Sequence, residues 1–163
     1  MDHDWWLWVL GTACAIHVIE EHASGWQGWA SRTFGKRLGV QPTWADFTAT
    51  NSALLFVAVA CAVVGWRAPW FAPSLPAVCV INAVLFHVGP SIAQRYPNPG
   101  VFTAVLFYLP LSTVVYVAAH RDGVVSLDTI VWSTVVGALL MALAMVTLIL
   151  GKRFHYADVS VSE

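Results

Sequence analysis

Charged side chains are scarce in this chain. Lysine, arginine, aspartate and glutamate make up 10% of its 163 residues, whereas soluble domains carry about 25%. The net charge of -1 lacks the basic excess that nucleic-acid binding needs, so we expect no nucleic-acid partner. The three cysteines all lie inside apolar runs and form no CxxC pair, so we expect neither a disulfide framework nor a zinc-finger motif.

Several catalytic motifs are missing too. The chain contains no glycine-rich phosphate loop, no GxSxG elbow and no CxxCH haem-attachment motif. It also lacks the repeated histidine boxes of membrane desaturases. Its first residues, Met1 to Asp4, include no basic segment, so we expect no removable signal peptide.

Hydrophobic residues, at 58% of the chain, dominate what is present. A helix needs about 20 mostly apolar residues to cross the hydrocarbon core of a bilayer. The segments that meet this requirement are residues 5–21, 44–66, 70–92, 101–119 and 127–151. We therefore predict an all-α polytopic membrane protein, in which a bundle of five transmembrane helices forms a single domain over residues 1–163.

Basic residues predict the orientation of this bundle. Most of them fall in loops on one side of the membrane: Arg32, Lys36, Arg37, Arg95, Lys152 and Arg153. Loops rich in lysine and arginine stay in the cytoplasm, so we expect the N-terminus outside and the C-terminus inside, in a bacterial inner membrane. Residues 23–43 combine Trp26 and Trp29 with basic residues, which favours an interfacial helix, either an anchor or a lid over a lipid-like substrate.

The run His17-Val18-Ile19-Glu20-Glu21-His22 is the most informative feature. Ionisable side chains within a membrane span are costly and usually face a protein interior or a polar cavity. The spacing of His17, Glu20 and Glu21 is i, i+3 and i+4, so a helix places them on one face. In the predicted orientation, polar residues of three other segments lie at a similar depth: Asp46, Asn51, Asn82, His87, Thr103 and Tyr108. We interpret Asp46 as the N-cap of its helix.

Metal binding is the preferred interpretation of this polar cluster. The expected ligands are His17, Glu20, Glu21 and His87, and the expected catalytic residues are His17, Glu20 and Glu21. Imidazole and carboxylate ligands suit zinc or iron. Zinc would favour hydrolysis and iron oxidation, with one glutamate free to act as a base. The residues expected to bind substrate or orient ligands are Asn51, Asn82 and Tyr108. His22 is either a further ligand or an interface residue.

Other interpretations remain open. Without a metal, the same histidine and glutamates would act as general acid and base. They would isomerise or cyclise a double bond of a polyene, terpenoid or sterol-like lipid, with aromatic rings such as Tyr108 stabilising a carbocation. Alternatively, the cluster is structural or lines an ion pathway, as in a transporter or accessory subunit. Two facing histidines also suit haem, although haem does not need paired glutamates.

The pattern His17-x-x-Glu20-Glu21, early in a small five-span chain, resembles the HXXEE family of small integral membrane proteins, which is named for this motif. Asn51, Asn82 and His87 downstream add to the resemblance, which covers most of the chain. It implies an enzymatic role for the motif residues and names neither a metal nor a substrate.

These observations lead to one expected function. We expect a metal-dependent enzyme, a hydrolase or an oxidoreductase, that acts on a hydrophobic lipid-like substrate in a cavity on the cytoplasmic side of the membrane. Its expected partners are membrane lipids and this small-molecule substrate. The sequence does not decide whether the protein forms a homo-oligomer.

Overall fold

The structure is a computed structural model that describes the backbone of residues 2–159, and the side chains of that range except those of residues 36–38 and 150–159. Its longer helices are α1 (Trp6–Ala23), α2 (Trp26–Leu38), α3 (Trp44–Val64) and α8 (Leu127–Val159). Two composite helices lie between α3 and α8. The first joins α4 (Ser74–Asn82), η2 (Ala83–Val88) and α5 (Gly89–Gln94), and the second joins α6 (Val101–Thr103), η3 (Ala104–Tyr108) and α7 (Leu109–Arg121). The described residues include no strand, which confirms the all-α class.

Four helices are long and apolar enough to cross a membrane within the described part of the chain. They are Trp44–Arg67, Ser74–Gln94, Val101–Arg121 and Leu127–Ile149. The segment expected at residues 5–21 falls in α1, which is not one of these four. Its C-terminal turns carry two glutamates and two histidines, and these polar side chains lower its hydropathy. Length and composition therefore support four spans rather than the expected five.

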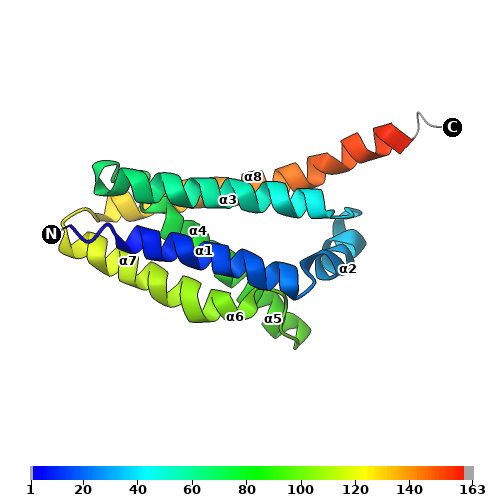
Figure 1. Ribbon diagram of the computed structural model, residues 1–163, viewed down its shortest axis with the longest axis horizontal. Coiled ribbons are helices and arrows are strands. Elements are labelled where there is room, and N and C mark those ends of the chain that lie inside the picture. Colours follow the sequence, from blue (N-terminus) through cyan, green and yellow to red (C-terminus); the bar gives the residue numbers. More distant parts are fainter. Residues whose placement is uncertain (1, 160–163) are drawn as a thin grey trace.

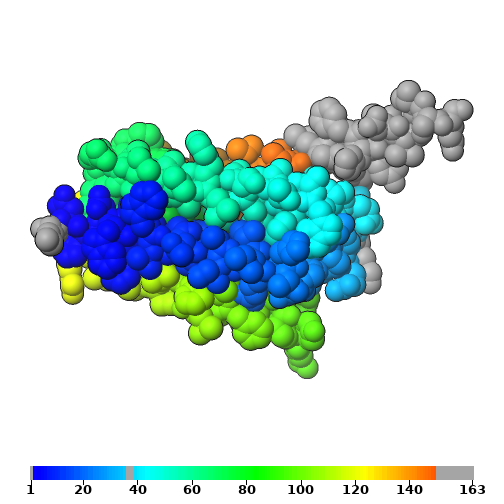
Figure 2. Space-filling view, viewed as in Figure 1, coloured from blue at the N-terminus to red at the C-terminus, as the bar shows by residue number. Residues whose placement is uncertain are grey.

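The helices form a bundle in which α1, α3 and the α6–α7 helix run side by side (Figure 1). On the face seen in Figure 2, α1 lies between α3 and the α6–α7 helix. Helix α8 packs closely on α4 through Gly137, where an added Cβ would lie 2.9 Å from the Cβ of Ala77. Small residues at such crossings let two helix backbones approach each other.

An apolar core fills the half of the bundle that precedes His17 along α1. Its members are buried and include Leu7, Leu10, Cys14, Cys61, Leu75, Cys79 and Val115, each at 0% exposure. The three cysteines are free thiols within this region. Two buried serines, Ser74 and Ser112, also lie on the helices of this region, so it is mainly but not wholly apolar.

Asp46 does not cap α3 in the expected way. Thr43 is the N-cap, and its hydroxyl accepts the backbone N–H of Asp46 at 3.2 Å. The Asp46 carboxylate accepts the N–H of Thr43 at 2.8 Å in return. We predicted Asp46 to be the N-cap. It instead occupies the third helical position of a capping box whose N-cap is Thr43.

Asp122 ties three segments together at the N-terminal end of the bundle. The backbone N–H of His3 donates to Asp122 Oδ2 at 2.5 Å, and the indole N–H of Trp66 donates to the same oxygen at 2.8 Å. His3 Nδ1 lies 2.6 Å from Asp122 Oδ1. The backbone N–H of His3, followed by its side chain, lowers the pKa of Asp122 from its ordinary value of 3.8 to about 2.

This tie predicts an acid-sensitive contribution to stability. Because the folded pKa lies below the unfolded one, the stabilisation is complete above pH 4 and disappears as the pH falls toward about 2. We expect Asp122→Asn to lower the unfolding temperature at neutral pH. We also expect the unfolding temperature of this variant to fall less than that of the wild type between pH 4 and about pH 2. Thermal unfolding in detergent measures both effects. The exposed Asp128→Asn is the matched control, and an equal acid response in both variants would contradict the assignment.

Candidate metal centre

Two of the helices that are long and apolar enough to cross a membrane contain a π-helical turn shortly before a proline. η2 precedes Pro90 and η3 precedes Pro110. A proline has no N–H for the carbonyl four residues earlier, so the regular α-helical bond is lost at both positions. Such π-helical turns often mark functional sites. Here η2 contains His87 and η3 ends at Tyr108, and both side chains are buried.

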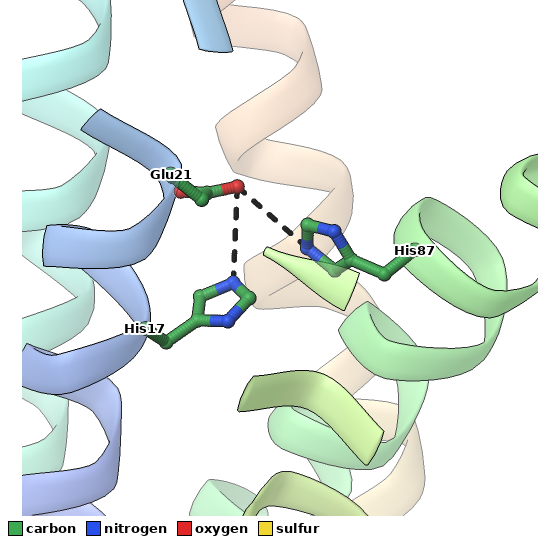
Figure 3. Close-up of side chains that lie close together, drawn as sticks. All are labelled: His17, Glu21 and His87. Atoms are coloured by element: carbon green, nitrogen blue, oxygen red, sulfur yellow. Dashed lines mark ion pairs between the residues drawn. The ribbon is translucent and has the colours of Figure 1, made fainter. Parts of the chain in front are cut away.

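His17, Glu21 and His87 meet in the interior of the bundle (Figure 3). His17 and Glu21 lie one turn apart on α1, and His87 reaches them from η2. Glu21 Oε1 is 3.7 Å from His17 Nε2 and 3.6 Å from His87 Nε2. All three side chains are buried. These separations exceed those of hydrogen bonds, and neither Nε2 atom has a hydrogen-bond partner.

The other nitrogen of His17 is held by Thr103. The Thr103 hydroxyl donates to the carbonyl of Gly100 at 3.2 Å, so it is free to accept from His17 Nδ1, which lies 2.7 Å away. His17 therefore carries its proton on Nδ1. Its Nε2 lone pair points toward Glu21.

His87 is oriented in the same way by Asn98. The Asn98 amide donates through Nδ2 to the carbonyl of Phe86 at 2.7 Å, so its Oδ1 faces His87 Nδ1 at 3.3 Å. Phe86 is the residue four positions before Pro90, and its carbonyl is the one that proline leaves unbonded. The Asn98 side chain therefore satisfies the free carbonyl of Phe86 and also favours the tautomer of His87 that is protonated on Nδ1.

This arrangement fits a metal ion. Two neutral imidazoles present buried Nε2 lone pairs to one carboxylate oxygen, and all three candidate ligand atoms lie within 4.8 Å of one another. Tetrahedral ligands at about 2.1 Å from zinc are separated by about 3.4 Å, close to the distances from Glu21 Oε1. Two histidines and one carboxylate also match the ligand set of non-haem iron. Hydrogen bonds to both Nδ1 atoms are the outer contacts that such ligands need.

Gly100 occupies the space beside both imidazole rings. Its φ of 90° lies in the left-handed region, which favours glycine. An added Cβ would lie 2.6 Å from Cε1 of His87 and 2.7 Å from Cε1 of His17. No side chain fits there without moving the rings.

Glu20 lies outside the cluster, although we expected it to be a ligand or base. Its carboxylate accepts the backbone N–H groups of Phe102 at 3.2 Å and Thr103 at 2.7 Å. It thus satisfies the first turn of the α6–α7 helix, where a negative charge is favourable. The reason is geometric, because adjacent residues of a helix point about 100° apart. Glu21 therefore faces the interior of the bundle, and Glu20 faces the α6–α7 helix.

His22 also lies apart from the candidate ligands. Its side chain is exposed, and its ring packs against Trp44 with a centroid separation of 4.6 Å. Of the two expectations for His22, this position fits the interface residue.

A cavity of about 310 Å³ adjoins the cluster. Glu21 and His87 are part of its wall, together with all three residues expected to bind substrate, Asn51, Asn82 and Tyr108. Asn82 Oδ1 and the Tyr108 hydroxyl are buried without a hydrogen-bond partner. The Tyr108 ring also packs on His17 at a centroid distance of 4.4 Å. The remaining wall is mostly apolar and aromatic, and α2, α3, α4 and α8 contribute to it.

Sequence reasoning did not assign roles to Asn98 and Gly100, and it noted Thr103 only for its depth. The run Tyr96-Pro97-Asn98-Pro99-Gly100 reads as a turn. The structure folds this turn back against the two histidines. An asparagine and a glycine between prolines, just after a helix with an internal His and Pro, are the signal that could have drawn attention to it.

Asn98→Ala tests the role of this turn. The variant leaves the Phe86 carbonyl and His87 Nδ1 without partners in a buried place, which costs about 1–3 kcal/mol for each group. We expect a markedly lower unfolding temperature and a metal affinity reduced by about 10–100-fold. Metal titration of the folded variant measures the second effect. Ser91→Ala is the control, because it removes only the hydroxyl that accepts the N–H of Asn98. Unchanged metal affinity in Asn98→Ala would contradict the assignment.

The fold and the cluster together define a class: a small all-helical protein with several helices long and apolar enough to cross a membrane, built around a buried histidine–glutamate site. The chain belongs to a family described as a protein of unknown function with HXXEE motif, whose model matches residues 8–115. That range contains His17, Glu20, Glu21 and His87, and it ends within α7. No curated protein and no solved structure matches the chain.

Proposed function

We propose that this protein is a metal-dependent membrane enzyme that acts on a hydrophobic, lipid-like substrate. One observation carries the proposal: two buried, unpartnered Nε2 atoms face one carboxylate oxygen at 3.6 and 3.7 Å. Buried polar atoms without partners are costly, so two such nitrogens that face one buried carboxylate oxygen suggest an absent group that pairs them. The adjoining apolar cavity supplies the place for a hydrophobic substrate.

The residues of the site have distinct roles in this proposal. His17, His87 and Glu21 would hold the metal, which would supply Lewis-acid chemistry if it is zinc and oxidation chemistry if it is iron. Thr103 and Asn98 keep both imidazoles in the ligating protonation state. Asn82 and Tyr108 would bind the substrate through their unpartnered oxygen atoms. The apolar wall would exclude water from the reacting atoms.

The same proposal includes α1 as a fifth membrane-crossing helix. Its outward side is apolar, with Trp8, Ile16 and Ile19 exposed by 50%, 41% and 66%, and its charged residues face neighbouring helices. A span whose polar side is buried in protein does not need uniformly high hydropathy. Five spans and the distribution of basic residues put the N-terminus outside and the C-terminus in the cytoplasm, in a bacterial inner membrane. α2 would then lie at the cytoplasmic interface.

Elemental analysis of the purified protein in detergent tests the metal. We expect near-stoichiometric zinc or iron in the wild type and its loss from His17→Ala and His87→Ala, because each variant removes one of three ligands. His22→Ala is the matched control, since His22 is on the same helix but exposed outside the cluster. Circular dichroism checks that the variants remain helical. A wild type that stays metal-free after reconstitution with both metals would sink the proposal.

That negative outcome would favour a second function. Glu21 and His17 would then act as acid and base in the isomerisation or cyclisation of a double bond. The aromatic side chains that line the cavity support this alternative, because their faces stabilise carbocations; they include Trp26, Trp29, Phe34, Phe47, Phe86 and Tyr108. A transporter or accessory subunit is less well supported, because mostly apolar side chains fill the half of the bundle that precedes His17.

A further inference from the structure

The cavity beside the metal centre is polar at one end and apolar at the other. Glu21, Asn51 and His87 line the part near α2, which also includes aromatic side chains of α2, whereas Val57 and Leu140 line the far end, where no ionisable side chain lies among the lining residues. α3 follows the cavity from Phe47 to Val57, a length of about 15 Å at 1.5 Å per residue. The candidate metal centre therefore lies near the end of the cavity that α2 lines, and an apolar slot extends from it toward Val57.

The slot opens sideways between α3 and α8. Ala49 and Ala53 of α3 line the cavity and are also exposed on the surface of the bundle. Leu143 and Thr147 of α8 do the same from the other side, and Leu143 is 58% exposed. These residues belong to the two helices Trp44–Arg67 and Leu127–Ile149, which are long and apolar enough to cross a membrane. The opening thus faces lipid.

The size of the cavity limits what it holds. A volume of about 310 Å³ is at the lower end of the range of about 300–1,000 Å³ for small-molecule sites. This space suits one chain or a small ring system and not the two acyl chains of a phospholipid. The polar side chains of the cavity lie toward the interfacial helix α2 and its apolar end lies deeper. A lipid in one leaflet has its polar and apolar ends in the same order.

The unpartnered atoms on the wall indicate the polar group of the ligand. Asn82 Oδ1 accepts hydrogen bonds only, and the Tyr108 hydroxyl donates or accepts. Both are buried and lack a partner within the described residues. A hydroxyl on the ligand would donate to Asn82, and its oxygen would remain available to the metal centre.

From these features we infer that the substrate is a single-chain amphiphile with a terminal hydroxyl. Its polar end lies beside Glu21, Asn82 and His87, its chain extends toward Val57 and Leu140, and it enters from the bilayer between α3 and α8. This inference rests on the proposed function, because it names the substrate class of the same site. Binding in this orientation does not itself require the reaction.

Photolabelling of the full chain in phosphatidylcholine nanodiscs tests the orientation. The probe is dodecan-1-ol with a diazirine next to its methyl end, which is the end far from the hydroxyl. We expect labels on Val57, Val78 and Leu140, located by fragmentation mass spectrometry. Val57→Trp fills the apolar end, so we expect labelling there to fall about tenfold or more. Val59→Trp is the matched control, because Val59 is on the same helix but 51% exposed outside the cavity.

Other labelling patterns overturn the inference. Labels confined to lipid-facing residues such as Val59, with equal yield in both tryptophan variants, show that the alcohol stays in the bilayer. Labels on Phe47 and Thr147 show the opposite orientation. The metal content of the same samples separates the two hypotheses. A metal-free wild type with labels at the apolar end overturns the proposed function alone, whereas a metal-loaded wild type without them overturns this inference alone.

Discussion

Gly100→Ala is expected to abolish metal binding and to destabilise the protein, although Gly100 is not itself a ligand. The added Cβ would lie 2.6 and 2.7 Å from the two imidazole rings, so both rings must move away from Glu21. The left-handed backbone costs roughly 1–2 kcal/mol for alanine, and overpacking adds about 1–3 kcal/mol. Metal content and thermal unfolding of the purified variant measure the two effects separately.

Gly123→Ala is the matched control for this experiment. Gly123 also has a positive φ, of 71°, but an added Cβ would meet nothing within 4 Å. We expect it to show only the backbone cost and to keep its metal. If Gly100→Ala retained metal as well as Gly123→Ala does, the rings would not be held as described, and the close packing at Gly100 would have no role in the site.

The Glu21→Gln variant is expected to be more stable than the wild type without metal and less stable with it. In the metal-free protein, an amide at position 21 offers two N–H donors to the two unpartnered Nε2 atoms, whereas a carboxyl group offers at most one O–H. Satisfying one more buried acceptor is worth about 1–3 kcal/mol. With zinc at about 1,000 times its dissociation constant, the wild type gains about 4 kcal/mol that the variant lacks.

Thermal unfolding with EDTA and then with zinc reveals whether this order reverses. Glu20→Gln is the control, because Glu20 binds backbone N–H groups of Phe102 and Thr103 instead of facing the histidines. It should lose stability by a similar amount in both conditions and keep its response to zinc. Equal zinc responses in Glu21→Gln and the wild type would rule out Glu21 as a ligand.

The two histidines of the cluster show how far sequence reasoning reaches. His17 and Glu21 were predictable as a pair because a helix places residues i and i+4 on one face. His87 was matched to them by depth along another predicted span. The separation of Glu20 from Glu21 was not predictable, because adjacent residues on α1 face different neighbours and only the packing of the α6–α7 helix shows which neighbour each one meets.

The turn at residues 95–100 shows what the sequence could not predict. Its prolines and glycine mark a turn, yet nothing local states that the turn folds back into the bundle. There Asn98 compensates for the N–H that Pro90 lacks, and Gly100 lies against both rings. These contacts join residues that belong to separate helices, so they depend on tertiary packing.

Composition and hydrophobic periodicity were sufficient for the all-helical class, the four apolar helices and the face of α1 that carries the motif. Long apolar runs satisfy their backbone groups only as helices in a bilayer, so this information is local. The set of candidate metal ligands, the tautomer of each histidine and the shape of the cavity were decided by the tertiary structure. They arise from contacts between α1, η2, η3 and the turn before α6, and no local rule relates positions so distant in the chain.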